Sequence, residues 1–160
     1  MTIKTSAGIT LLIGPAHNVS YGEDAAGITA AIAALKALDY IEIGEVEDAG
    51  EIGDEAGTAD FTALGNRRKR KVKGTFDAGS QTVILGEDPK DTGQAALKAA
   101  LRSDSNFAVQ MDYGDGSSDY YLVQVLSFRK QIGSAESIRK ASVSLAINSA
   151  IYEDAPPAGP

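Results

Sequence analysis

The segment FTALGNRRKRKVKGTFDAGSQTVILGEDPKDTGQAALKAALR, residues 61–102, determines the fold that we expect for this chain. It begins as a strand, breaks at Gly65-Asn66, continues as a basic run and turns at the Asp77–Ser80 cluster. Residues 81–85 are apolar and β-branched, which predicts a short strand. The segment therefore predicts a hairpin, a strand and then one helix.

The helix that ends this segment has a clear start signal. Asp91 is at the N-cap position and Gln94 follows three residues later, a capping box in which Asp replaces the usual Ser or Thr. The residues that share one face at helical spacing are Gly93, Leu97, Ala100 and Leu101. Because this face is narrow and the helix is short, we expect it to pack on a sheet.

Alternating hydrophobicity predicts further strands on both sides of this segment. They cover residues 9–13, 40–46, 106–113, 119–128 and 138–148. A second helix is expected near residues 25–38, capped by Asp24. Strands that surround one capped helix predict a mainly β fold, an antiparallel β-sandwich or barrel with a flanking α-helix.

Two of the late strands have informative faces. In residues 119–128, Leu122, Leu126 and Phe128 are expected on one face and Tyr121, Val123 and Val125 on the other, so this strand should be central. The last strand has one apolar face and one face of small polar residues. The small polar face consists of Lys140, Ser142, Ser144, Ala146 and Asn148. Such a face suits the wall of a water-filled lumen shared between subunits.

Three segments lack a regular pattern within what we interpret as one domain over residues 1–160. Residues 1–8 are expected to form an N-terminal arm and residues 153–160 a C-terminal tail. Residues 47–60 are rich in Gly and acidic side chains, and we interpret them as a long loop. Long loops within compact domains are uncommon and tend to be functional.

The composition narrows the classes of function. The net charge of −7 favours solubility and argues against general nucleic-acid binding. Because the chain has no cysteine, it has no disulfide or thiolate chemistry. No stretch predicts a signal peptide or a membrane span, so the default expectation is assembly in a cytoplasm.

The sequence contains only weak signals for a catalytic or a metal site. His17 is the only histidine, and a lone histidine makes neither a multi-His metal site nor a triad. Glu45 and Glu47 could imitate a glycosidase pair, but they begin a solvated acidic stretch. The aspartates of residues 112–119 lack calcium-loop spacing and favour a hairpin turn. We therefore expect no catalytic residue, cofactor or metal.

Three blocks together resemble a known family, the major tail tube protein of long-tailed, non-contractile phages (siphophages). They are GEVEDAGEIG at residues 44–53, KGTFDAG at 73–79 and LGEDPKDTGQAAL at 85–97. With the last strand, the likeness covers about residues 40–150. The expected helix at 25–38 departs from the family pattern, in which this interval is more often a loop.

The resemblance implies a structural virion protein that assembles in the host bacterial cytoplasm and forms stacked hexameric rings in the phage tail. DNA would pass through the lumen without specific binding, residues 47–60 and the terminal arms would contact the next ring, and no membrane would be involved. The implied partners are further copies and the tape measure, tail terminator and tail tip proteins. A type VI secretion ring protein is an alternative, and a small β-fold hydrolase a weaker one.

The charged residues suggest where copies meet. We expect the basic run to contact the acidic stretch of an adjacent copy, although the run could also protect a strand edge from unwanted pairing. The basic residues are Arg67, Arg68, Lys69, Arg70 and Lys71, and the acidic residues are Glu45, Glu47, Asp48, Glu51, Asp54 and Glu55.

Overall fold

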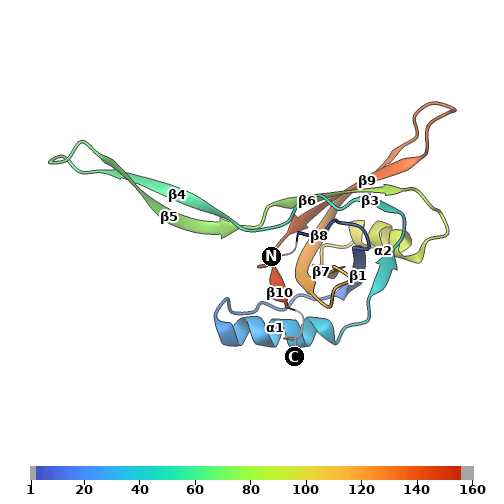
Figure 1. The fold of residues 1–160 in the computed structure, drawn as a ribbon, viewed down its shortest axis with the longest axis horizontal. Helices are drawn as coiled ribbons and strands as arrows, with labels where there is room; N and C mark the ends of the chain where they lie inside the picture. The colour runs from blue at the N-terminus through green and yellow to red at the C-terminus, as the bar shows by residue number, and fades with distance from the viewer. Residues whose placement is uncertain (1–2, 156–160) are drawn as a thin grey trace.

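The computed structural model describes residues 3–155 and contains ten strands and two helices within that range. In chain order they are β1 (Thr10–Ala16), α1 (Ala25–Lys36), β2 (Ile41–Ile43), β3 (Val46–Asp48), β4 (Glu55–Thr62), β5 (Lys69–Asp77), β6 (Ser80–Gly86), α2 (Thr92–Leu101), β7 (Phe107–Asp112), β8 (Ser118–Gln131), β9 (Lys140–Ile147) and β10 (Tyr152–Asp154). Figure 1 shows a curled sheet from which two hairpins project.

The main sheet is antiparallel and has the strand order β2-β1-β7-β8-β9-β6-β3, with β10 paired to the first part of β8. Its two end strands, β2 and β3, follow each other directly in the chain. The sheet therefore curls on itself, and the short connection between β2 and β3 joins its two ends. This is the mainly β, barrel-like fold with a flanking helix that the strand pattern predicts.

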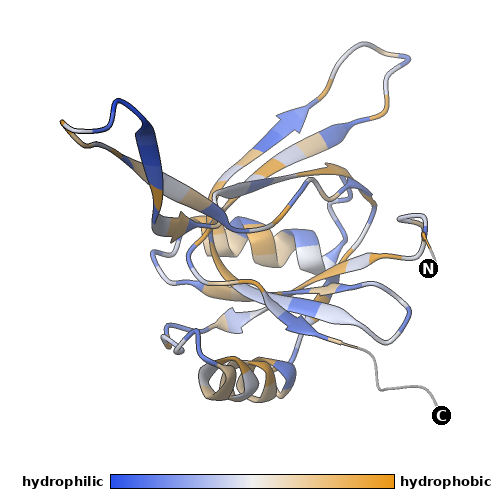
Figure 2. Ribbon diagram, turned by 60° about the vertical axis from the view of Figure 1, so that its left-hand side comes forward, coloured by the Kyte–Doolittle hydropathy of each residue, from blue (hydrophilic) through white to orange (hydrophobic). Residues whose placement is uncertain are grey.

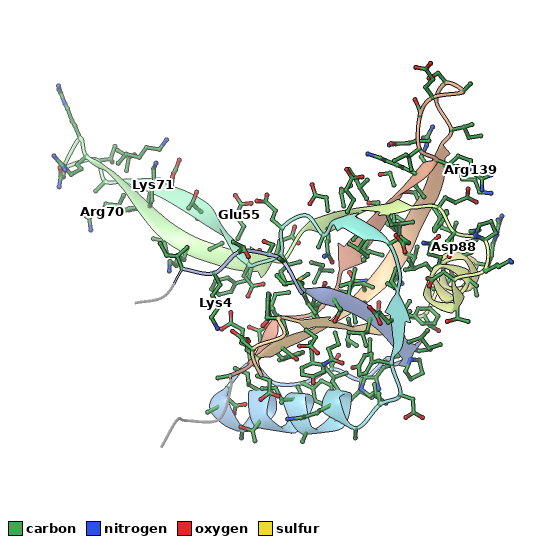
Figure 3. All side chains as sticks on the ribbon, turned by 45° about the vertical axis from the view of Figure 1, so that its right-hand side comes forward. Lys4, Glu55, Arg70, Lys71, Asp88 and Arg139 are labelled. Carbon is green, nitrogen blue, oxygen red and sulfur yellow. The ribbon has the colours of Figure 1, made fainter. Side chains whose placement is uncertain are left out.

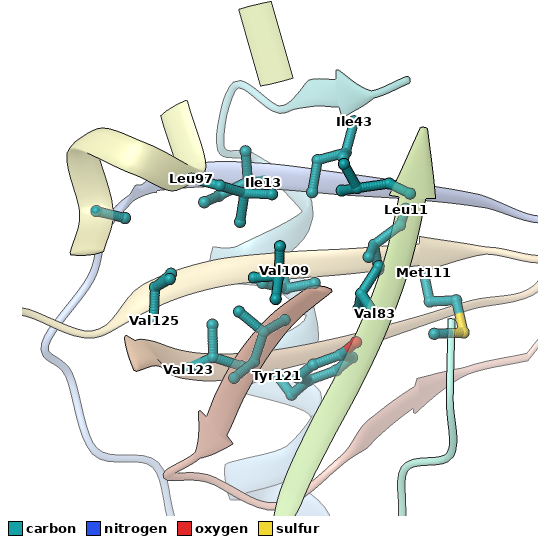
Figure 4. Close-up of a cluster of buried hydrophobic side chains, with 14 of the residues drawn as sticks. Leu11, Ile13, Ile43, Val83, Leu97, Val109, Met111, Tyr121, Val123 and Val125 are labelled. Atoms are coloured by element: carbon teal, nitrogen blue, oxygen red, sulfur yellow. The ribbon is translucent and has the colours of Figure 1, made fainter. Parts of the chain in front are cut away.

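The inside of the curled sheet is an aliphatic core. Every second residue of β9 is buried, as the sequence pattern predicts, and Tyr121 is completely enclosed with its hydroxyl donating to Gln81 over 2.6 Å. Figure 4 shows the strand side chains around Val109, with Leu97 of α2 reaching the same cluster. Helix α2 thus covers one end of the sheet with the face predicted from its spacing.

The outside of the sheet is covered only in part. Helix α1, which begins at the predicted cap Asp24, packs its buried Ala31 and Leu35 on a second apolar cluster over β7, β8 and β10. The rest of the outer face, over β8, β9 and β6, has no covering element among residues 3–155 (Figure 1).

Gln94 and Asp91 join the two ends of the sheet through a buried set of hydrogen bonds. The Gln94 amide nitrogen donates to the carbonyls of Gly44 (3.2 Å) and Gly86 (2.8 Å), and its oxygen accepts from the Asp88 N–H (3.0 Å). Asp91 caps α2 by accepting from Gln94 N and also accepts from Gly44 N. The expected capping box is therefore only half present, because the Gln94 side chain bonds to the sheet and not to the Asp91 N–H.

These hydrogen bonds of Gln94 and Asp91, which we call the joint, explain two backbone features. Glu45 has a positive φ of 60°, the only such residue besides glycine in the described chain, and its carbonyl accepts from Gly86 N over 2.7 Å. This left-handed residue splits the predicted strand 40–46 into β2 and β3. At Gly93, an added Cβ would lie 2.2 Å from the Glu42 carbonyl oxygen, so only glycine lets α2 approach β2 this closely.

The structure corrects three further predictions. Residues 47–60 are not one loop, because 46–48 form β3 and 55–62 form β4. Leu126 and Phe128 do not share a face with Leu122 as predicted, because a bulge lies between Val125 and Ser127 in β8. After the bulge the side chains alternate in the opposite sense, so Phe128 packs against the core and Leu126 is exposed. Residues 152–154 form β10, so the expected C-terminal tail begins as a strand. Residues 1–2 of the expected N-terminal segment and residues 156–160 of the tail lie outside the described residues.

Replacing Asp91 tests the joint. We expect Asp91→Ala to lower the free energy of unfolding by about 2 kcal/mol, since it removes a helix cap and also the acceptor of the half-buried Gly44 N–H. Urea unfolding measures this change. The matched control is Asp24→Ala, which removes an exposed cap and should cost only about 1 kcal/mol. Equal losses in the two variants would show that Asp91 acts as a cap alone.

Candidate assembly surfaces

The most exposed element is the hairpin of β4 and β5, residues 55–77, which we call the long arm. All nine residues of β5 and seven of the eight in β4 are exposed. With eight residues in β4, the paired part extends about 25 Å from the sheet. Such a hairpin buries too little surface to be stable through its own packing, so it is suited to contact another molecule.

The two faces of the long arm differ in chemistry. The register places Ala59 opposite Val72 and Phe61 opposite Arg70 on one face. The other face pairs Thr58 with Lys73, Asp60 with Lys71 and Thr62 with Lys69. The basic side chains of β5 are therefore divided between the two faces, with Arg70 on one and Lys69, Lys71 and Lys73 on the other. Arg67 and Arg68 precede β5, in the turn at the tip.

The acidic stretch lies at the opposite end of the long arm from these basic residues. Glu51, Asp54 and Glu55 border a hollow at the base of the arm together with Asp77. In Figure 3, Glu55 lies where the arm leaves the sheet, whereas Arg70 and Lys71 lie toward its tip. The tip therefore cannot reach the acidic base of the same chain.

The remaining predicted acidic residues are dispersed. Glu45 is at the joint, and Glu47 forms an ion pair with Lys140 of β9 at 2.8 Å, next to Asp48 on β3. The basic run has one partner in its own arm, an exposed pair of 2.7 Å between Lys69 and Asp60. Exposed pairs of this kind contribute roughly 0–1 kcal/mol each. The chain thus leaves most of the basic tip free of ion pairs within residues 3–155.

A second hairpin, which the sequence pattern does not identify as a surface, projects beside α2. This short arm, residues 126–140, contains the outer ends of β8 and β9 and the turn between them (Figure 1). At its base, the carboxylate of Glu87, only 3% exposed, pairs with Lys130 (3.1 Å) and Arg139 (3.3 Å). The hydrogen bond from Lys130, together with the nearby Arg139 charge, lowers the pKa of Glu87.

The two arms account for the charge pattern of the whole chain. They contain ten of the fifteen basic residues and four of the twenty-two acidic residues, which leaves five basic and eighteen acidic residues in the rest of the chain, the body. Figure 2 shows the strongly hydrophilic strand of the long arm beside apolar residues of the same hairpin. The short arm already pairs with the body of its own chain through Glu87 and Glu47, whereas the basic tip of the long arm can meet body carboxylates only on another copy.

The uncovered outer face of the sheet is small and polar. Register pairs place Thr82 opposite Ser144 and Ser80 opposite Ala146, with Ser127 of β8 also opposite Ser144. This face is the one that the alternation of residues 138–148 predicts, and its residues are exposed or half-buried. Two cations lie on this face: Arg129, which is exposed and pairs in register with Ser142, and Lys140, which forms the ion pair with Glu47.

The residues considered for chemistry have structural roles. His17 Nε2 shares a hydrogen bond with the Tyr21 hydroxyl at 2.6 Å. Asp112 and Asp115 accept from Gly114 N and Ser117 N, so they shape the β7–β8 turn. Within residues 3–155, no His, Asp and Glu side chains form a group of three that could hold a metal ion. Neither helix described there is long and apolar enough to cross a membrane.

Comparisons with known proteins agree with this architecture. Residues 25–151 match the family model described as "Lambda phage tail tube protein, TTP". The tail of an empty GTA particle with C6 symmetry has a TM-score of 0.59 at 18% identity, over 72% of this chain and 87% of that chain. The SPP1 tail tube has a TM-score of 0.56 at 13% identity, over 91% and 76%. The anti-feeding prophage baseplate has a TM-score of 0.66 at 9% identity, over 99% and 100%. No curated protein sequence matches.

Replacing Glu87 tests how the short arm is held. Folding lowers the pKa of Glu87, so the ionised carboxylate stabilises the folded state at any pH above the pKa of an unfolded glutamate, about 4.3. This stabilisation is lost as the pH falls further, through the lower pKa that Glu87 has in the folded state. We therefore expect amide protection factors at Arg129–Gln131 to fall on acidification in the wild type. In Glu87→Gln, the amide protection factors of these residues should already be low at neutral pH.

The control for this experiment is Glu136→Gln, which changes an exposed carboxylate at the tip of the same arm. Its protection factors should follow those of the wild type. If Glu87→Gln retained full protection at neutral pH, the ion pairs would not hold the arm.

Proposed function

The chain belongs to the lambda phage tail tube protein family, and we propose from this that it assembles into stacked hexameric rings that form the tube of a virion tail. The family is a structural one, and its model covers most of the chain. The six-fold symmetry of the GTA tail supports a ring of six. The observation that carries the proposal is the long arm, an exposed basic hairpin on an acidic body.

In this proposal, the long arm connects one ring to the next. Its tip is separated from the acidic base of its own chain by the length of β4 and β5, so the acidic base that it meets belongs to another copy. Contacts between two different surfaces can repeat without limit along an axis, as a tube requires. Each ion pair is weak, but repetition around every ring sets the register.

The uncovered sheet face suits the wall of the channel. A wall lined with lysine and arginine would hold DNA, because each neutralised phosphate adds affinity through counterion release. The face around Thr82 and Ser144 is instead mostly small and neutral, with Arg129 exposed on it and Lys140 paired with Glu47. We infer that DNA passes this face without specific binding.

The remaining parts of the proposal follow from the family. Assembly takes place in the host bacterial cytoplasm, and the tube contacts a tape measure protein inside and terminator and tip proteins at its ends. We also infer that the chain is not an enzyme. A contractile injection tube is a second candidate, favoured by the fold match to the anti-feeding prophage baseplate over almost the whole chain. The family match favours the phage tail.

Reversing charge at the tip of the long arm tests the contact between rings. We expect Arg68→Glu combined with Arg70→Glu to weaken tube assembly, most strongly at low salt, where exposed charges are least screened. Sedimentation of assembled protein over a salt series measures this effect. Lys90→Glu with Arg102→Glu is the control, since it makes the same change in net charge at exposed positions of the body. Equal loss of assembly in both variants would show that only net charge matters.

Adding lysine to the proposed channel wall tests the position of the lumen. We expect wild-type tubes to bind DNA feebly at physiological salt. Tubes of Thr82→Lys with Ser144→Lys should bind DNA with a salt slope that is steeper by about one unit or more per added lysine in contact with phosphate. Lysine at Ala63 and Gly65, in the turn of the long arm, is the control. If the control bound DNA and the sheet variant did not, the channel wall would be elsewhere.

A further inference from the structure

The turn at the tip of the long arm presents two basic side chains that are free of ion pairs. Residues 63–68 connect β4 to β5, and Arg67 and Arg68 lie in this turn, directly before β5. Both side chains are exposed, and neither forms an ion pair within residues 3–155. Hydrogen bonds of 3.2 Å run from Asn66 N to the Ala63 carbonyl and from Arg68 N to the Asn66 side chain. Exposed tips of this kind are preferred sites of proteolytic cleavage.

The long arm can open without disturbing the core. Strands β4 and β5 pair only with each other among the described strands, and neither hydrophobic cluster of residues 3–155 includes a residue from 55–77. An isolated two-stranded hairpin is marginally stable at best in water. Cleavage of a segment that opens and closes rapidly follows the population of its open form. The bonds after Arg67 and Arg68 are therefore accessible to an endopeptidase after only a small local opening.

The basic residues of the short arm are protected from the same reaction. Lys130 and Arg139 pair with the carboxylate of Glu87, and Lys140 pairs with Glu47. A basic side chain that is bound in an ion pair cannot enter the specificity pocket of a protease at the same time. The carbonyl of Arg139, which a protease would attack, also accepts a hydrogen bond of 3.1 Å from the Glu87 N–H. The two hairpins thus have basic residues in common but differ in how accessible the adjoining peptide bonds are.

We propose that the tip of the long arm is a processing site at which an endopeptidase specific for basic residues cuts the free subunit after Arg67 or Arg68, and that this cut prevents assembly. The enzyme class follows from the residues, because a specificity pocket with a carboxylate at its base selects lysine and arginine. The effect on assembly rests on the proposed function, in which this tip contacts another copy. The cleavage itself depends only on the free chain.

The reaction is hydrolysis of one peptide bond. Water supplies the second oxygen of the new carboxylate on Arg67 or Arg68, the C–N bond breaks, and the nitrogen becomes the ammonium group of the next residue. Both strands stay attached to the body, because β4 is joined to β3 through residues 49–54 and β5 leads into β6. The body therefore stays folded, while the two strands lose the turn that joins them and separate more easily.

Trypsin, which has an aspartate at the base of its specificity pocket, is the probe for the site. Mass spectrometry of the full chain over a time course under native conditions should show cuts after Arg67 or Arg68 first. These cuts should be at least about tenfold faster than cuts after Lys130, Arg139 or Lys140. A first cut in the short arm or within either helix would overturn the proposal.

Matched variants test why the tip is selected. Arg67→Gln combined with Arg68→Gln should slow cleavage of the long arm about tenfold, because the basic residues that remain there lie in the paired strand β5. Lys90→Gln with Arg102→Gln makes the same change in net charge on the body and should leave the rate unchanged. Glu87→Gln frees the basic side chains at the base of the short arm and should raise cleavage there. Equal rates at the long arm in all three variants and the wild type would contradict the proposed site.

The effect on assembly is measured with protein that has been cut to completion at the tip. Its thermal unfolding midpoint should match that of the intact chain, and it should fail to sediment as assembled protein where the intact chain does. Tubes formed beforehand should resist trypsin at the tip. Cut protein that assembles like the intact chain would overturn the effect on assembly.

The outcomes separate this inference from the proposed function. If the intact chain forms no tubes but is still cut first after Arg67 or Arg68, the tube is wrong and the processing site stands. If the intact chain forms tubes but the free subunit is cut first elsewhere, the processing site is wrong and the tube stands.

Discussion

The buried side chain of Gln94 is the interaction on which the rest of the structure depends. It bonds to Gly44, where β2 passes into β3, to Gly86 at the end of β6 and to Asp88 before α2. These are the two ends of the curled sheet and the helix that covers it. A buried amide with all its bonds satisfied fixes one arrangement, because any other would leave polar groups without partners.

The positions of both arms follow from this joint. The long arm begins a few residues after β3, and its return strand leads directly into β6. The short arm is held by Glu87, which follows Gly86 in the chain. The Glu87 N–H donates to the Arg139 carbonyl over 3.1 Å, and the Glu87 carboxylate pairs with the Arg139 side chain. A closed sheet of this kind gives the arms a fixed direction relative to the acidic body. Basic arms with fixed directions allow the same contact to repeat from copy to copy, which random surface charges would not.

Much of the fold could be predicted from the sequence because its signals are local. The alternation of β9, the caps Asp24 and Asp91 and the spacing on α2 all depend on neighbours within a few residues. The hairpin of the long arm is predicted from the break at Gly65-Asn66, but the first part of β4 is not, because β4 is exposed on both faces and EAGTADFT has no alternation of burial to detect. The bulge in β8 and the left-handed Glu45 depend on the strands beside them. Gln94 has a local signal as part of a capping box, but its true partners are eight and fifty residues away.

The candidate surfaces could also be predicted from the sequence only in part. The basic run and the acidic stretch are visible in the sequence, but their placement at opposite ends of one hairpin requires the register of β4 and β5. The short arm could have been suspected from Ile132 and Ile138 on either side of a turn, a signal that is weak without knowledge of burial.

Electron microscopy of the concentrated protein tests the central claim, self-assembly into a tube, most directly. We expect tubes with a six-fold cross-section and an open channel, in which the tip of each long arm contacts the acidic base of another copy. Protein that remains as separate monomers at high concentration would contradict it, as would tubes whose long arms end in solvent.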